Sequence, residues 1–350
     1  MNSTARQGND PGLGPDGRDD PILVVGPAWV GDMVMAGSLF MALKRRWPGR
    51  PIDVLAPATT LPVLDFMPQV RRGIAQPLGH GRFGLAERRR LGRSLRDTGY
   101  GTAYVLPRSW KSALVPFFAR VPERIGYWGE ARIGLLNRPR RLDKRRLGRT
   151  VERFVALAGP ADTVPAVDPP RLAVPAAAIS SVRAEVLPDI KAGNRLLALC
   201  PGAEYGPAKR WPAANAGRFA ALATAAGWSV CLIGGPKDRE IAGAIRELAP
   251  GARDLTGRTT LAQAIALIAG ADQVVSNDSG LMHVAAALGR PQVALFGSSS
   301  PAHTPPLSTD ARTIALDLPC QPCFARECPL GHLNCLVGIT PERVMAEIAP

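Results

Sequence analysis

Aromatic residues are scarce in this chain, since Phe, Trp and Tyr make up 5% of its 350 residues. This composition disfavours a protein that stacks successive nucleotide bases on an aromatic platform. Long apolar runs are also missing, because no stretch reaches the roughly 18 consecutive residues that a membrane span requires. Residues 1–20 are rich in Gly, Asp and Pro and lack the apolar core of a signal peptide. We therefore expect a disordered tail over residues 1–20 and a cytoplasmic protein whose only membrane contact is peripheral.

Cysteine and acidic residues are few as well. Six cysteines are too few for a disulfide framework in a chain of this length, which agrees with a reducing compartment. Asp and Glu number 29 against 43 Lys and Arg, giving a formal net charge of +14. This surplus, crowded between Arg82 and Arg149, favours a polyanionic partner: nucleic acid, an anionic membrane surface or a phosphorylated substrate. A solvated basic face explains it equally well, so the charge alone selects no partner.

Apolar residues are plentiful, and their arrangement indicates an α/β fold. They make up 46% of the chain, which is typical of a globular protein, and the length favours two domains. Short runs of Val, Ile and Leu alternate with helical spacing, as in parallel α/β layers. The pattern begins with a strand over 21–26 and a helix over 32–47, fades near 160–175 and restarts with a strand over 196–199. We predict two doubly wound sheets facing a cleft lined by the carboxyl ends of their strands.

The first candidate site is the segment 26–32 (GPAWVGD), where the first strand gives way to the first helix. It has neither the Gly-Lys-Ser/Thr of a P-loop nor a dinucleotide fingerprint. Its glycines suit either a backbone that approaches a ligand closely or an ordinary tight turn. Asp32 suits either a cap of the helix or a general base, held ionised by the helix terminus at the mouth of the cleft.

Two further sites lie at corresponding positions in the second half. Residues 201–211 (PGAEYGPAKRW) follow its first strand, and their small residues with Lys209 and Arg210 suit either a phosphate site or a solvated basic loop. Residues 276–287 (SNDSGLMHVAAA) again join a strand to a helix, and their free N–H groups would form an anion site. Asp278 suits a cap or a contact with a sugar hydroxyl, and His283 suits structural packing or a functional contact.

Four cysteines cluster near the end of the chain with His332 among them: Cys320, Cys323, Cys328 and Cys335. Four thiols this close together are compatible with a structural zinc site, but their spacing has only one close pair and fits no standard finger. The alternative is a set of free thiols that order the loop. We expect no catalytic metal.

Taken together and in this order, these segments resemble the ADP-heptose:lipopolysaccharide heptosyltransferases of glycosyltransferase family nine, and among them the second heptosyltransferases. The resemblance covers residues 22–350. Six blocks carry it: GPAWVGDMVMAGSL (26–39), YVLPRSWKSALVPFFARVPERIGY (104–127), CPGAEYGPAKRWP (200–212), NDSGLMHVAAALGRP (277–291), SSSPAHTPPLS (298–308) and CQPCFARECPLGHLNC (320–335).

The resemblance implies a GT-B architecture with two Rossmann-like domains. Residues 21–175 would bind the acceptor, and residues 176–335, which include the Cys-rich loop, would bind ADP-heptose. Residues 336–350 would form a C-terminal helix that packs back toward the first domain. The implied reaction is an inverting transfer of L-glycero-D-manno-heptose from ADP-heptose to the heptosyl-Kdo2-lipid A inner core of lipopolysaccharide, without a cofactor.

The roles of individual residues follow from the same resemblance. Asp32 becomes the general base, and Lys209 neutralises the departing diphosphate. The donor contacts would be Gly31, Glu204, Asp238, Asp278, Ser279, Gly280, Leu281 and His283, and the acceptor contacts Arg108, Lys111 and Arg124. Because Asp32 and Lys209 belong to different domains, we expect catalysis to depend on domain closure.

Other functions are compatible with parts of this pattern. A first heptosyltransferase, or a related transferase for another nucleotide sugar, would share the fold and the three sites. A nucleic-acid-binding protein would use the basic face and lose affinity steeply with salt, but the chain has no recognised nucleic-acid motif, so we expect no such partner. An inactive scaffold is disfavoured because Asp32, Lys209 and the 277–283 block are all retained.

Overall fold

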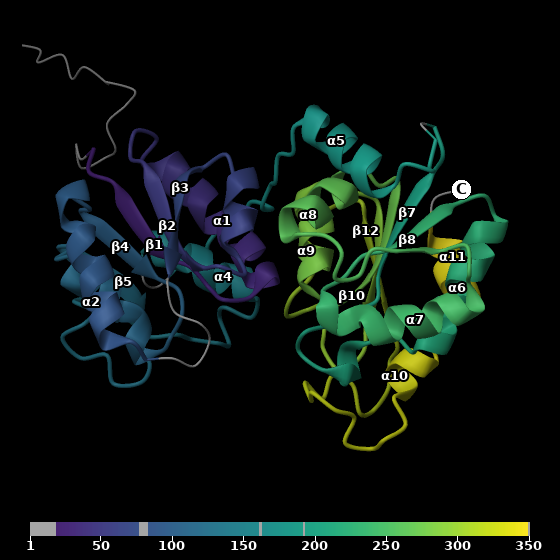
Figure 1. Cartoon of the computed structure of the whole chain (residues 1–350). Helices are drawn as coiled ribbons and strands as arrows, with labels where there is room; N and C mark the ends of the chain where they lie inside the picture. The colour runs from purple at the N-terminus through teal and green to yellow at the C-terminus, as the bar shows by residue number, and fades with distance from the viewer. Residues whose placement is uncertain (1–18, 77–82, 161–162, 192, 349–350) are drawn as a thin grey trace, which may run out of the picture.

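The computed structural model describes residues 19–76, 83–160, 163–191 and 193–348. Within it the chain forms two parallel sheets, each covered by helices on both faces (Figure 1). No helix in this described part of the chain is both long enough and apolar enough to cross a membrane. The tail expected over residues 1–20 lies outside the described residues except for its last two.

The first sheet has six parallel strands in the order β3-β2-β1-β4-β5-β6. The strands at its centre are short and wholly buried, which explains their continuous apolar sequences. Its strands are β1 (Ile22–Val25), β2 (Ile52–Pro57), β3 (Val70–Gln76), β4 (Thr102–Val105), β5 (Glu123–Tyr127) and β6 (Arg138–Arg140).

The second sheet repeats this topology, with the order β12-β11-β10-β7-β8-β9. Counted from its own first strand, each sheet therefore has the doubly wound order 3-2-1-4-5-6 of dinucleotide-binding folds. The strands of the second sheet are β7 (Leu196–Cys200), β8 (Ser229–Leu232), β9 (Arg253–Asp254), β10 (Gln273–Asn277), β11 (Gln292–Phe296) and β12 (Ala311–Ala315). The predicted pair of doubly wound sheets is what the structure has.

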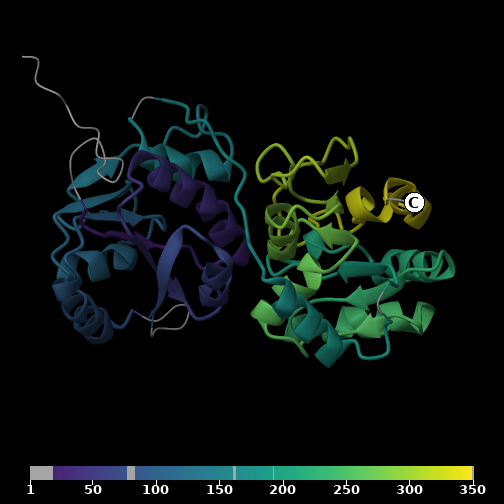
Figure 2. The same cartoon turned by 90° about the horizontal axis from the view of Figure 1, so that it is seen from above.

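The helices divide between the two faces of each sheet. In the first half these are α1 (Val30–Arg46), α2 (Leu85–Ser94), α3 (Leu114–Phe118) and α4 (Thr150–Val155), with short 3₁₀ turns η1 (Leu61–Phe66), η2 (Arg96–Thr98), η3 (Trp110–Ala113) and η4 (Ala156–Ala158). In the second half they are α5 (Ala176–Val186), α6 (Ala213–Ala225), α7 (Arg239–Leu248), α8 (Leu261–Ala269), α9 (Gly280–Ala287), α10 (Asn334–Val337) and α11 (Pro341–Glu347), with η5 (Pro207–Lys209) and η6 (Pro236–Asp238). Helices α1 and α4 face α8 and α9 across the junction of the two halves, whereas α2 and α3 lie on the outer face of the first sheet (Figures 1 and 2).

Helix α1 is buried on nearly all sides because it lies between the first sheet and the second half. Every residue from Met33 to Phe40 is buried, and a helix that is apolar around its circumference requires such surroundings. The helix ends before Pro48, which cannot continue it. Its N-cap is Trp29 rather than Asp32, so the interpretation of Asp32 as the cap is wrong, and Asp32 lies within the first turn.

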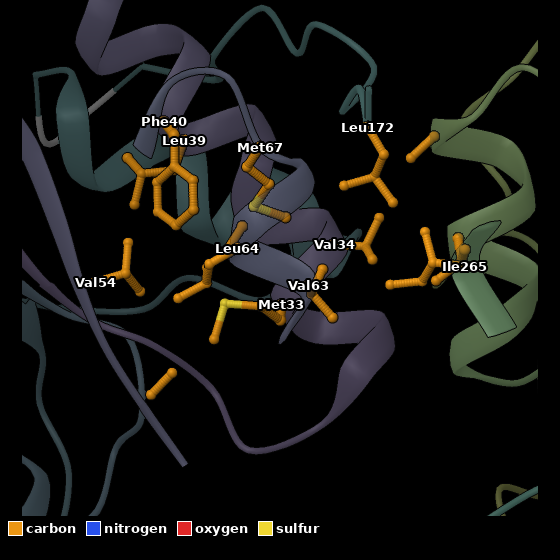
Figure 3. Packing of buried hydrophobic residues seen from close by; sticks show 14 of the residues in the cluster. Met33, Val34, Leu39, Phe40, Val54, Val63, Leu64, Met67, Leu172 and Ile265 are labelled. Atoms are coloured by element: carbon orange, nitrogen blue, oxygen red, sulfur yellow. The ribbon is translucent and has the colours of Figure 1, made fainter. Parts of the chain in front are cut away.

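One apolar cluster runs through both halves. Val34 of α1 and Val63 of η1 face Leu172 of the connecting segment and Ile265 of α8, and all four are fully or almost fully buried (Figure 3). The two halves are therefore joined by packed side chains as well as by the connecting chain.

The C-terminal helix does not pack toward the first half, contrary to the expectation. Helix α11 lies against α6, and Val344 shares an apolar cluster with Trp211 and Phe219. The Trp211 indole N–H donates to the Ile339 carbonyl at 2.9 Å, which fixes the chain just before α11. Burial of these side chains holds α11 on the outer face of the second sheet (Figure 2).

Candidate active site

The three segments singled out in the sequence all follow central strands of the two sheets. The strand order reverses between β1 and β4 in the first sheet and between β7 and β10 in the second. In open parallel sheets, ligands bind beyond the carboxyl ends of the strands at such a reversal. The segments after β1, β7 and β10 stand at these two positions, so the topology places them where a ligand site is expected.

The amino-terminal ends of α1 and α9 meet through two glycines. A Cβ atom on Gly280 would lie 2.9 Å from Val30 Cβ and 3.2 Å from the Gly31 nitrogen. A Cβ atom on Gly31 would lie 2.7 Å from His283 Cδ2. Real Cβ contacts are not this short, so only glycine at both positions lets the two helix termini approach this closely.

Asp32 lies at this junction and carries a perturbed carboxyl group. Burial raises its pKa to about 6, the charge of Lys209 lowers it, and the charge of Asp278 raises it. Both of these residues belong to the second half, so the structure brings the predicted base within electrostatic range of the predicted donor site. A carboxyl with a pKa near neutrality is well matched to abstract a proton at physiological pH.

Lys209 and Asp278 form a short ion pair. Lys209 Nζ lies 2.6 Å from Asp278 Oδ2, and the side chain of Asp278 is only 4% exposed. The Ser299 hydroxyl donates to the same oxygen at 2.5 Å. In this arrangement Asp278 holds the ammonium group of Lys209 at the junction, where an anion would compete for it.

Ser299 was missed by the sequence analysis as a member of the site. It follows β11, which pairs with β10, so its side chain reaches the carboxyl edge where Asp278 lies. Three consecutive serines after a buried strand were the available signal, and the block 298–308 was noted without any role for its residues.

His283 is buried and packs against the backbone of the other half at Gly31. Burial lowers the pKa of its imidazole to about 4, so the ring is neutral near pH 7. The structure thus gives His283 a packing contact between the halves, and its burial favours the neutral imidazole.

The first turn of α9 offers unpaired backbone donors. Ser279 is the N-cap in extended conformation, so the interpretation of Asp278 as the cap is wrong, and the N–H groups that begin the helix have no acceptor within it. Gly280 and Leu281 are partly exposed in contrast to the buried remainder of α9. This terminus carries the positive end of the helix dipole and suits the phosphate of an anionic ligand.

Glu204 and Asp238 lie near the candidate donor site but hydrogen-bond neither Lys209 nor Asp278 in the described chain. Asp238 packs on the backbone of Gly202 and Gly234 and accepts a hydrogen bond from Gly235 N–H at 2.9 Å, while burial raises its pKa. Glu204 is exposed and lies 2.5 Å from Lys237 Nζ. Both therefore stand near the loop after β7, engaged with neighbouring groups of the second half.

The basic residues expected to bind the acceptor are separated by the structure. Arg108, just after β4, lines an open groove of about 510 Å³ with Arg141, Leu142, Asp143, Lys144 and Arg145. Arg124 is instead committed to the backbone, because its guanidinium donates to the Leu135 and Val121 carbonyls at 2.7 and 2.6 Å. Lys111 lies in η3 and does not line this groove. Of the three, Arg108 alone is placed in the basic groove.

The Cys-rich loop supports the loop that carries Lys209. Its Arg326 carbonyl accepts a hydrogen bond from Ala208 N–H at 3.0 Å, and its Phe324 N–H donates to the Ser298 carbonyl at 2.7 Å. Cys320, Cys323, Cys328 and Cys335 line a small cavity of about 20 Å³. Hydrogen bonds from backbone N–H groups, led by that of Leu333, lower the pKa of Cys328, whereas burial raises that of Cys335. No group of three or more His, Cys, Asp or Glu side chains within the described ranges has the geometry of a metal site.

Comparison with known proteins identifies the family to which the chain belongs. The family model for glycosyltransferase family 9 (heptosyltransferase) matches residues 88–334. The chain is 46% identical over 337 residues to lipopolysaccharide heptosyltransferase 2 of Salmonella typhimurium, covering 93% of this chain and 97% of that protein. It is 45% identical over 342 residues to lipooligosaccharide heptosyltransferase 2 of Haemophilus ducreyi, covering 93% and 98%.

A solved structure supports the same relationship in three dimensions. The ADP-heptose LPS heptosyltransferase II of E. coli superposes with a TM-score of 0.83 at 43% identity, covering 93% of this chain and 97% of that one. Sequence, topology and the paired helix termini at the junction lead to one assignment: this chain is a glycosyltransferase and belongs to glycosyltransferase family 9, the heptosyltransferases.

Proposed function

We propose that this protein transfers L-glycero-D-manno-heptose from ADP-heptose to heptosyl-Kdo2-lipid A, as a second heptosyltransferase of the lipopolysaccharide inner core. The observation that carries the proposal is that Asp32 of the first half lies within electrostatic range of the Lys209–Asp278 pair of the second half. A candidate base and a candidate diphosphate site thus meet at one junction. The relatives named above are second heptosyltransferases, and the alignments cover almost their full length. This supports a second heptosyltransferase over a first heptosyltransferase.

The proposed reaction is a single displacement with inversion at the anomeric carbon. The ionised Asp32 carboxylate takes the proton of the acceptor hydroxyl as its oxygen attacks the anomeric carbon of heptose. The bond from that carbon to the phosphate oxygen breaks, and ADP departs with the electron pair. The proton ends on Asp32, from which it passes to solvent.

Lys209 and the α9 terminus supply the positive charge that the departing diphosphate requires. The ammonium group of Lys209 would exchange Asp278 for a phosphate oxygen, while the N–H groups of Ser279, Gly280 and Leu281 hydrogen-bond the others. Neutral His283 would contribute only a hydrogen bond to the donor. Gly31 would allow the end of α1 to approach the end of α9 closely. Because cationic groups of the chain cover the leaving group, we propose a reaction without a catalytic metal.

Two less direct donor contacts complete the site. We assign Glu204 and Asp238, on the loops after β7 and β8, to the nucleoside part of ADP-heptose, where carboxylates would accept hydrogen bonds from ribose hydroxyls. The acceptor would lie on the first half, with its phosphates or carboxylates in the groove that contains Arg108. Lys111 would contact the acceptor near the rim of that site. Arg124 would stabilise the site through its hydrogen bonds to the backbone.

The division of labour follows the two sheets: we assign residues 21–175 to the acceptor and residues 176–335 to the donor. Of residues 336–350, the described part up to residue 348 then completes the donor half, since α11 packs on α6. The acceptor is a membrane lipid and ADP-heptose is water-soluble, so we place the enzyme in the cytoplasm, in peripheral contact with the inner membrane.

The test is ADP release by the purified protein given ADP-heptose with either Kdo2-lipid A or its monoheptosylated form. Release with the monoheptosylated acceptor alone is expected. ADP release with the heptose-free acceptor would make the protein a first heptosyltransferase. No ADP release with either acceptor would exclude this donor or this activity. Mass spectrometry of the product identifies the sugar that has been added.

A further inference from the structure

Large exposed apolar side chains gather on one part of the first half. Within 51 residues of sequence, six such side chains are at least about a third exposed: Phe83 47%, Leu85 44%, Trp110 37%, Phe117 41%, Trp128 42% and Ile133 77%. Single exposed apolar side chains are normal on a soluble protein, but a contiguous group of them marks an interaction surface. None of these side chains belongs to the junction that holds Asp32 and Lys209.

Several contacts connect these side chains into one surface. The rings of Phe83 and Trp110 stack with their centroids 5.6 Å apart. Buried Arg88 donates to the carbonyls of Phe83 and Lys111, which ties the start of α2 to η3. Helix α3 continues from η3 and packs against α2, so that a Cβ on Gly92 would lie 2.5 Å from Phe118 Cβ.

The surface continues beyond α3 to the turn that carries Ile133. The guanidinium of Arg124 lies over the Phe117 ring at 5.6 Å and donates to the Gly134 carbonyl at 3.5 Å. Trp110 N–H donates to Glu130 Oε2 at 2.8 Å, which brings the same turn alongside η3. Phe83, Trp110, Phe117 and Ile133, with Leu85, thus form the apolar part of what we call the α2–α3 surface.

A basic border adjoins this apolar part along α2 and at Arg96, whose guanidinium donates to the Phe118 carbonyl at 3.0 Å. Arg89, Arg90 and Arg93 are exposed on α2. Burial and then the charges of Arg120, Arg93 and Arg89 lower the pKa of Arg96, which places these like charges close together. Within the part of the chain that the structure describes, none of these five arginines forms an ion pair with a carboxylate. Asp97 acts on Arg96 in the opposite direction, but the five arginines outnumber it, and this excess of positive charge is complementary to a polyanionic surface.

The α2–α3 surface lies where a bound partner would not block the donor half. It lies on the outer face of the first sheet, away from the second half (Figures 1 and 2). The basic groove adjoins it, because Arg108 in that groove lies two residues before Trp110 and packs on Gly129, next to the Glu130 that accepts the Trp110 backbone N–H. A flat partner bound to this surface would leave the donor half free and would lie next to the groove.

We propose that the α2–α3 surface docks on an anionic phospholipid bilayer and so brings the acceptor groove to the lipid in which the acceptor is anchored. The inference rests on the proposed function for the identity of the acceptor. Aromatic and aliphatic side chains enter the region between headgroups and acyl chains, while the arginines bind the anionic headgroups. The exposed aliphatic side chains of Leu85 and Ile133 offer nucleotide bases no ring to stack on, and the like charges of the basic border would repel the same surface of a second copy.

The first experiment measures binding to vesicles without any acceptor. Full-length protein is floated with vesicles of phosphatidylglycerol and phosphatidylcholine, or of phosphatidylcholine alone, at low and high salt. The variant Arg89→Gln/Arg90→Gln/Arg93→Gln and the variant Phe83→Ser/Trp110→Ser/Phe117→Ser are compared with Arg218→Gln/Arg246→Gln/Arg258→Gln. The last removes the same charge from exposed sites on the second half.

The α2 arginine variant is expected to lose at least about tenfold in affinity for anionic vesicles, and the second-half variant less than threefold. The aromatic variant is expected to lose affinity as well and to become more salt-sensitive, because only charge then holds it. Equal binding by all variants, or no preference of the wild-type protein for anionic vesicles, would overturn the proposal. So would a wild-type dimer that the α2 variant converts to monomer in light scattering, because the surface would then bind a second copy.

A transfer assay separates this inference from the proposed function. With an acceptor whose acyl chains have been removed, the α2 variant is expected to match the wild-type kcat/KM within twofold. With the intact acceptor embedded in anionic vesicles, its kcat/KM is expected to fall about tenfold. A wild-type protein that binds vesicles but transfers no heptose to either acceptor would refute the proposed function and leave the docking surface intact.

Discussion

The amino-terminal ends of α1 and α9 both lie where a sheet reverses its strand order, yet their aspartates have opposite surroundings. Each helix follows a central strand at the point where its sheet reverses strand order, and each has an Asp at that end. Asp278 is paired with Lys209 and accepts a hydrogen bond from Ser299. Asp32 has no such partner in the described chain and is left with a raised pKa. One carboxylate is thereby committed to orienting a cation, and the other is left able to take a proton.

This difference follows from which half supplies the neighbours. The Lys209 loop and Ser299 belong to the same sheet as Asp278, so the pair forms within one half. Asp32 receives its electrostatic environment from the opposite half, through the contact between Gly31 and Gly280. Each of the following changes either removes the difference between the two aspartates or measures it.

The largest effect is expected from Asp32→Asn. Loss of the base should lower kcat by about a thousandfold, within the range typical of general-base catalysis. The affinity for ADP-heptose, measured by calorimetry, should stay within about threefold because Asn preserves the shape of the side chain. A comparable loss of donor affinity would instead assign Asp32 a structural role.

Lys209→Met comes next, with an expected loss of about a hundredfold in kcat, the usual effect of removing one group that stabilises charge in the transition state. The substitution also leaves the buried Asp278 carboxylate without its cation, so Tm should fall. Adding Asp278→Asn should restore Tm without restoring kcat. Recovery of kcat in the double variant would show that Lys209 serves only to neutralise Asp278.

The pH dependence tests the protonation of Asp32 without any substitution. Since burial raises the pKa of Asp32 to about 6, kcat/KM of the free enzyme should fall about tenfold per pH unit below that value. A folded pKa above the unfolded one means that this group contributes stability below about pH 4 that is lost as the pH rises through about 6. Asp32→Asn should therefore raise Tm at pH 8. An activity limb near pH 4 would identify a carboxylate with an ordinary pKa as the base.

The smallest effect is expected from Gly280→Ala. The new methyl group would meet Val30 at 2.9 Å, which forces the two helix termini apart and moves Asp32 away from Lys209. We expect kcat/KM to fall about tenfold, as for other displacements of a catalytic group by a fraction of an ångström to one ångström. Gly243→Ala on α7, where a Cβ meets no atom within 4 Å, is the matched control and should leave kcat/KM unchanged. Equal effects of the two substitutions would mean that the junction tolerates separation.

The strands that the sequence predicted well are those at the centre of each sheet. The strands over 196–199 and 21–26 were found within two residues of β7 and β1, because burial on both faces demands a continuous apolar run. The edge strand β3 was not predicted, because its sequence VRRGIAQ is largely exposed and lacks a continuous apolar run. It pairs with a neighbouring strand on one side only. The family assignment and the fold are both confirmed.

The site was predictable where a residue follows its own strand. Asp32, Lys209 and Asp278 could be singled out because each lies in the segment that leads from the carboxyl end of a strand to the next helix. The packing of His283 on Gly31 was not predictable, because it depends on how two residues that are 252 positions apart in the sequence meet. The destination of α11 was missed for a similar reason: its apolar residues fit Trp211, and nothing local distinguishes that partner from the first half.

The apolar cluster that runs from Val34 and Val63 to Ile265 has a consequence for folding cooperativity. Because side chains of both halves complete one buried cluster, unfolding either half would expose apolar surface of the other. A single calorimetric transition is therefore expected, with an enthalpy that matches its van't Hoff value. Two resolved transitions would instead indicate separate folding units. The connecting segment divides the chain into two sheets, but the energetic unit of this protein is the whole pair.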